Sequence, residues 1–71
     1  MITVRVFSRE GRAQSGKEVK VHGAGVSSAR TDSSGSANFD RLSSGRYDVY
    51  IDGKKVYSGA IVGVQVVHVD L

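Results

Sequence analysis

The chain has 71 residues, a formal net charge of +3 and no cysteine. This length predicts a single domain spanning residues 1–71, and the lack of cysteine excludes disulfides and cysteine metal sites. The basic residues are scattered without a run of like charges, which argues against a nucleic-acid binder. Short stretches that alternate apolar and polar residues, separated by glycine and serine, predict an all-β fold. In chain order, strands are expected at residues 2–7, 17–23, 29–32, 36–39, 46–51, 54–58 and 65–71.

Two segments between these strands have recognisable turn chemistry. Residues 24–28 are expected to form a connection of small residues, and residues 32–35 (DSSG) are expected to form a turn. Seven short strands with closely spaced turns predict a small seven-stranded antiparallel β-sandwich.

The clearest hairpin centres on Asp52 and Gly53, a dipeptide typical of a two-residue type I′ turn. The register that follows from this turn pairs Ile51 with Lys54, Tyr50 with Lys55, Val49 with Val56, and Asp48 with Tyr57. This register buries both valines of the third pair and places Tyr50, Lys55 and Tyr57 together on the outer face.

The last strand has an ambiguous pattern, because either its even-numbered or its odd-numbered apolar residues can face inward. We expect the odd-numbered set to face inward, because this leaves His68 and Asp70 in water. The candidate core is then Ile2, Val4, Val6, Val19, Val21, Ala37, Phe39, Leu42, Tyr47, Val49, Ile51, Val56, Ile61, Val67, Val69 and Leu71.

Three segments carry a resemblance to a known family: residues 16–21 (GKEVKV), 29–39 (ARTDSSGSANF) and 42–49 (LSSGRYDV). Written as G-x-x-V-x-V, T-D-x-x-G-x-A-x-F and L-x-x-G-x-Y-x-V, they resemble the carboxypeptidase regulatory-like and transthyretin-like (prealbumin-like) domains, and the related collagen-adhesin B-type and starch-binding-like folds. The resemblance spans about residues 2–57. It implies a Greek-key, transthyretin-like sandwich that serves as a non-catalytic accessory module in surface, secreted and carbohydrate-active proteins.

The motif residues also have a direct physical interpretation. Asp32 can accept backbone hydrogen bonds in its turn, and Gly35 can adopt a positive φ. Tyr47 resembles a tyrosine corner, whose ring packs in the core while its hydroxyl bonds nearby backbone. The internal Lys–Asn cross-link of collagen-adhesin B-type domains is not expected, because the first strand offers Arg5 in place of lysine and Asn38 lies in a middle strand.

No pattern indicates catalysis, and we expect no enzyme activity, no catalytic residue, no metal site and no cofactor. His22 and His68 occupy outward strand positions without a clustered third ligand, so solvated strand faces explain them. The serines lie in turns without a nucleophile elbow, and a strand-rich domain of this size leaves little room for a catalytic cleft.

The candidate binding residues are Tyr50, Lys55 and Tyr57. Exposed tyrosines suit a protein interface or the stacking of sugar rings, although cross-strand aromatic pairs can also simply stabilise a sheet. Phe7 and Val66, if also outward, would enlarge this surface.

The sequence therefore predicts a structural or protein-binding accessory module, with a carbohydrate-binding module that stacks sugars on exposed tyrosines as the alternative. A protein is the first expected partner and a carbohydrate the second, and the domain is expected to be a monomer or a weak oligomer. No signal-peptide pattern or long apolar run is visible, so membrane insertion is not expected. Two compartments stay open: the cytoplasm, or a longer secreted or surface protein, since many secreted bacterial domains also lack cysteine.

Overall fold

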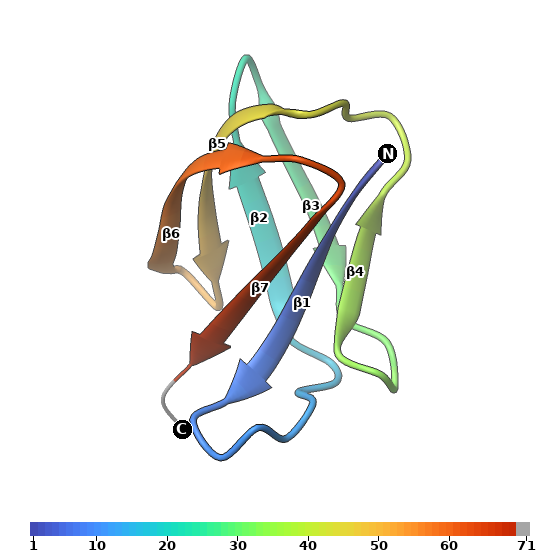
Figure 1. Cartoon of the computed structure of the whole chain (residues 1–71), viewed down its shortest axis with the longest axis vertical. Helices are drawn as coiled ribbons and strands as arrows, with labels where there is room; N and C mark the ends of the chain where they lie inside the picture. Colours follow the sequence, from blue (N-terminus) through green and yellow to red (C-terminus); the bar gives the residue numbers. More distant parts are fainter. Residues whose placement is uncertain (70–71) are drawn as a thin grey trace.

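The computed structural model describes residues 1–69, and these residues form a sandwich of two β-sheets (Figure 1). The small sheet has the order β4-β1-β7, and the large sheet has the order β3-β2-β5-β6. The strands are β1 (Ile2–Ser8), β2 (Glu18–His22), β3 (Val26–Arg30), β4 (Ser36–Phe39), β5 (Gly45–Ile51), β6 (Lys54–Ile61) and β7 (Val64–Val69). The predicted all-β sandwich is confirmed.

The core lies between the inner faces of the two sheets and follows the period-two pattern of the sequence. In β1, for example, Ile2, Val4 and Val6 are fully buried, whereas Arg5 is exposed. The buried apolar residues are Ile2, Val4, Val6, Val19, Val21, Ala37, Phe39, Val49, Ile51, Ile61 and Val67, and the residues packed against them are Ala29, Leu42, Tyr47, Val56, Tyr57 and Val69. The predicted core is thus confirmed for the described residues. Leu71, which was also predicted to be in the core, lies outside the described residues.

The third strand lies earlier in the chain than predicted. β3 spans Val26–Arg30, so the expected strand at 29–32 began too late and ended too late, and residues 26–28 of the expected connection are strand instead. The chain turns within three residues, where the Gly23 amide donates to the Gly25 carbonyl at 2.9 Å. Pairing with β2 then draws two serines of weak strand propensity into the ladder, because neighbouring strands override local preference.

The prediction of an antiparallel sandwich was wrong for one pair of strands, because β1 and β7 run parallel. The chain leaves the large sheet at the end of β6 and crosses to the small sheet, where β7 lies beside β1. The predicted orientation of this last strand is confirmed: Val67 is buried, whereas Val64, Val66 and His68 are exposed. Asp70 lies outside the described residues.

The β5–β6 hairpin begins in the predicted register and then departs from it. Asp52 and Gly53 have φ angles of 50° and 86°, which confirms the type I′ turn. The first two pairs of the ladder are as predicted, but a β-bulge follows between positions 49 and 50. The ladder continues with Val49 opposite Tyr57 and Asp48 opposite Ser58, so the two predicted pairs beyond the bulge were wrong.

The bulge has a simple physical reason. Val56 is the extra residue in β6, and both Val56 and Tyr57 pack against the core. A regular strand would turn one of these two side chains to the outer face, and the bulge keeps both on the inner face.

The family-like motif residues have the predicted local roles. Asp32 accepts hydrogen bonds from the Ser34 and Ser36 amides at 2.9 and 3.0 Å, and Gly35 has a φ of 79°. The Tyr47 hydroxyl donates to the Ser43 carbonyl at 2.8 Å, as in a tyrosine corner.

Candidate functional surfaces

The predicted binding residues do not form one site. Tyr50 lies on the outer face of the large sheet, directly between Lys20 of β2 and Lys55 of β6. Tyr57 belongs to the inner face, and its hydroxyl donates to the Ala60 carbonyl at 2.6 Å. The structure therefore brings Tyr50 and Lys55 together and separates Tyr57 from them, so the predicted grouping of the three was wrong.

The aromatic neighbour of Tyr50 is a histidine instead. The rings of His22 and Tyr50 are tilted by 47° with their centroids 4.6 Å apart, and both side chains are half-buried. His22 was predicted from the sequence to be exposed to solvent. The contact was missed because nothing in the local sequence indicates that β2 pairs with β5. This contact fits the cross-strand stabilisation of a sheet.

A polar cluster lies beside this ring pair. Asp48 is the register partner of His22, and its carboxylate accepts a hydrogen bond from the Ser58 hydroxyl at 2.6 Å. The Lys55 ammonium lies 4.0 Å from the same carboxylate oxygen. In a catalytic triad the histidine stands between serine and acid, whereas here the serine bonds the acid directly. The geometry therefore provides no proton relay of that kind.

Neither a metal cluster nor a membrane span is found in the part of the chain that the structure describes. No three His, Asp or Glu side chains gather there as ligands, and His22 and His68 stand on different sheets. The same residues contain no helix with the length and hydropathy needed to cross a membrane.

The outer face of the small sheet presents apolar side chains to solvent. Val64 and Val66 of β7 are 55% and 42% exposed, and Val62, in the connection before β7, is 78% exposed. The parallel register places Phe7 beside His68, with ring centroids 6.2 Å apart. Phe7 and Val66 thus face outward, but on the sheet opposite Tyr50, so they form a separate surface that we call the valine face. It comprises Arg5 and Phe7 of β1, Val64, Val66 and His68 of β7, and the exposed Val62 in the connection that leads into β7.

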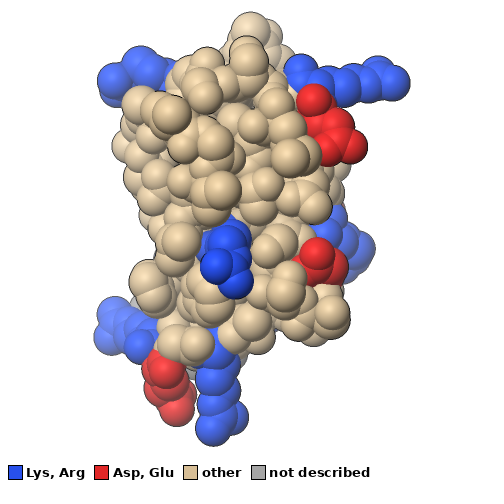
Figure 2. All heavy atoms as spheres, turned by 45° about the vertical axis from the view of Figure 1, so that its right-hand side comes forward, with Lys and Arg blue, Asp and Glu red and all other residues tan. Residues whose placement is uncertain are grey.

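The valine face carries little charge. Arg5 stacks on Phe7, with its guanidinium carbon 5.0 Å from the ring centroid, and it forms no ion pair with any residue in the range 1–69. Figure 2, viewed from the side of β1 and β4, shows a broad uncharged surface with one basic side chain near its middle. Most other charged side chains stand toward the margins of this view.

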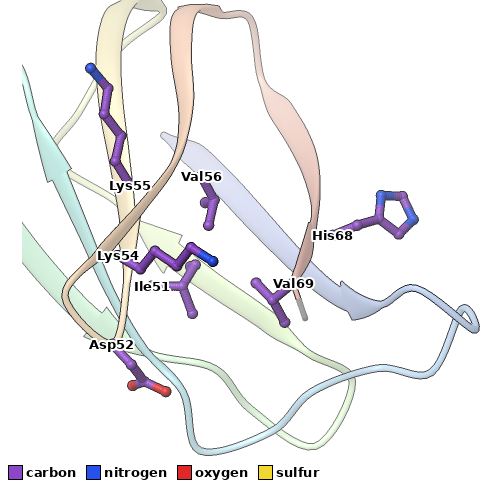
Figure 3. A pocket seen from close by; sticks show the side chains of 7 residues that line it. All are labelled: Ile51, Asp52, Lys54, Lys55, Val56, His68 and Val69. Carbon is purple, nitrogen blue, oxygen red and sulfur yellow. The ribbon is translucent and has the colours of Figure 1, made fainter. Parts of the chain in front are cut away.

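A cavity of about 430 Å³ opens at the seam between the two sheets, where β6 begins and β7 ends. Figure 3 shows that the Lys54 side chain reaches across this space, between Val56 and Val69, while His68 points away from it. The described lining residues are Ile51, Asp52, Lys54, Lys55, Val56, His68 and Val69. The inner wall of the cavity is thus apolar, and its mouth is basic.

The comparisons with known proteins do not supply a function. No protein-family model matches the chain, and neither a curated protein nor a solved structure matches it. The resemblance to carboxypeptidase regulatory-like and transthyretin-like domains therefore stays a prediction, and the function has to be argued from the surfaces.

Proposed function

We propose that this domain is a non-catalytic structural or protein-binding module that contacts its partner through the valine face. The observation that supports this is the row of three exposed valines, Val62, Val64 and Val66. Exposed apolar side chains gathered on one side of a domain are typical of a contact with another macromolecule. The transthyretin-like resemblance agrees, because it implies an accessory module.

The chemistry of the valine face favours a protein over a sugar or a nucleic acid. Sugar binding needs an aromatic platform with hydrogen-bonding groups around it, and Tyr50 and Tyr57 lie on opposite faces of their sheet and cannot floor one groove. Nucleic-acid binding needs a basic stripe, whereas the valine face holds the single cation Arg5 and one histidine.

Photo-crosslinking from defined positions tests the proposal. The photoreactive residue p-benzoylphenylalanine replaces Val64 in one variant and Ser28 in the control, since Ser28 is exposed on the outer face of the large sheet. In cells that express the natural chain, we expect discrete protein crosslinks from position 64 that an excess of unmodified domain abolishes. Equal crosslinking from both positions, or none from either, would contradict the proposal.

A titration with soluble oligosaccharides completes this test. We expect no change in the amide NMR spectrum of the domain. Shifts confined to Tyr50 and its neighbours His22 and Lys55 would instead favour the sugar-binding alternative.

A further inference from the structure

β7 is an edge strand with a free side. Its only partner in the described part of the chain is β1, and its other side faces β6 without pairing (Figure 1). Two backbone groups of this free side have local partners: the Val64 amide donates to the Val62 carbonyl at 2.9 Å, and the Val66 carbonyl accepts from the Gln65 side chain at 3.0 Å. These local bonds can be exchanged for bonds to an added strand, with which exposed edge groups pair.

The protection that blocks strand addition at other edges is missing from β7. Edge strands are usually shielded by charged side chains, bulges, proline or short length. β6 has two lysines and a bulge, β4 has only four residues, and β3 has five residues and carries Arg30. β7, with the sequence VQVVHV, has no lysine, arginine, acid, glycine or proline and no bulge in its register.

A strand added to this edge would meet the seam cavity. Strands pair about 4.8 Å apart, so the added strand would lie beside β7 on the side that faces β6. Its alternate side chains would point inward to the cavity wall formed by Ile51, Val56 and Val69. The remaining side chains would point outward and lie next to Val64 and Val66. The seam therefore fits an extended segment with apolar residues at alternate positions.

The positive charge of Lys54 at the mouth of the cavity indicates which side chain the added segment carries there. Lys54 reaches across the cavity (Figure 3) and forms no ion pair with any residue that the structure describes. The other three lysines, by contrast, all lie within 4.0 Å of a carboxylate: Lys17 near Asp52, Lys20 near Glu18 and Lys55 near Asp48. A carboxylate on the incoming segment would complete the ion pair that Lys54 lacks.

We propose that a partner protein binds by strand addition: an extended segment with alternating apolar residues pairs with the free edge of β7, and one of its acidic side chains pairs with Lys54. The proposal rests on the protein-binding function above and names the mode and chemistry of the contact. A second copy of this chain fits less well, because each β7 would offer the other copy's Lys54 no carboxylate, and both copies carry a net charge of +3.

A displayed library of random peptides, slightly longer than the six residues of β7, tests the proposal against the immobilised domain. We expect the enriched peptides to alternate apolar residues and to carry an aspartate or glutamate. Lys54→Glu should lower the affinity of such a peptide by about tenfold and should select peptides with a basic residue in place of the acid. Lys20→Glu makes the same charge change on the outer face of β2 and should alter neither result.

The binding site is located by amide NMR with the enriched synthetic peptide. Shifts and slowed amide exchange should concentrate in Val64–Val69 and at Val56. The proposal would be overturned by any of three results: peptides that shift the amide signals around Tyr50, peptides that keep an acidic consensus with Lys54→Glu, or no enrichment of peptides. Concentration-dependent β7 shifts without peptide would indicate a second copy as the occupant.

The failure of this proposal is distinguishable from failure of the proposed function. If position 64 crosslinks a protein but no peptide reaches β7, the domain binds its partner through the valine face without strand addition. If neither experiment detects binding, the protein-binding function fails as well.

Discussion

The ring of Tyr47 lies so close to Gly23 that a β-carbon on the glycine would be 2.8 Å from two ring carbons. The ring cannot easily move away, because its hydroxyl bonds the Ser43 carbonyl. Gly23→Ala should therefore destabilise the domain by about 1–3 kcal/mol through overpacking. Gly25→Ala is the matched control, since a β-carbon there meets no atom within 4 Å. Chemical denaturation of both variants checks this, and equal destabilisation would contradict it.

The hydroxyl of Tyr47 makes a separate contribution that a second variant isolates. Tyr47→Phe keeps the ring against the core and removes only the hydrogen bond to Ser43. We expect a loss of about 1 kcal/mol in the free energy of unfolding, the typical value of one hydrogen bond. An unchanged denaturation midpoint would mean that this corner does not stabilise the fold.

The core could be predicted from the sequence because burial follows a period of two in nearly every strand. Val19, Val21 and Val67 all face inward because apolar and polar residues alternate in their strands. This pattern can be read without knowing which strands are neighbours. Which strands pair depends instead on contacts far apart in sequence. The parallel pairing of β7 with β1, and hence the valine face, had no local signal beyond the outward position of Val66.

The candidate site could not be predicted correctly, because it depended on the register of one hairpin. The turn at Asp52 fixes the first two pairs, but the bulge at Val56 then moves Tyr57 to the inner face. A tyrosine is tolerated there because its hydroxyl bonds the Ala60 carbonyl locally. Both Val56 and Tyr57 are apolar enough to be buried, so their order alone does not reveal the bulge.

Thr31 is a buried polar residue that forms hydrogen bonds to the long connection between β1 and β2. Its hydroxyl donates to the Gln14 carbonyl at 2.6 Å and accepts the Lys17 amide at 2.9 Å. Thr31→Val keeps the shape and leaves both groups without this partner, so we expect a loss of about 1–3 kcal/mol. Thr3→Val is the control, because it removes an exposed hydrogen bond to Asn38 and should cost less. The reverse order in denaturation experiments would contradict the role of Thr31.

The turn at Asp32 predicts a dependence of stability on pH. Hydrogen bonds from the Ser34 side chain, and from the Ser36 and Ser34 amides, lower the pKa of Asp32 from its ordinary 3.8. A carboxyl whose pKa is lower in the folded state stabilises the fold above pH 3.8, and this stabilisation is lost as the pH falls through the folded value.

Melting temperatures from pH 6 to acid conditions check this expectation. Asp32→Asn should melt below the natural chain near neutral pH, and the difference should shrink once the pH falls below about 3.8. Asp40→Asn removes the same charge in the next turn and serves as the control. A constant difference between the Asp32 variant and the natural chain at every pH would refute the proposed linkage.

The hairpin turn joins β5 to the edge strand β6, and Gly53 is one of its two residues with a positive φ. Its φ of 86° lies in the left-handed region, where a side chain costs about 1–2 kcal/mol and a β-branched one is strained further. Gly53→Val should therefore destabilise the domain by at least about 1 kcal/mol and weaken the Tyr50–Lys55 cross-strand contact in amide NMR spectra. Gly25→Val adds the same side chain where there is open space and no positive φ, and it should have a smaller effect. If Gly53→Val retained both the native stability and the cross-strand contact, the type I′ turn would not be what sets the hairpin register.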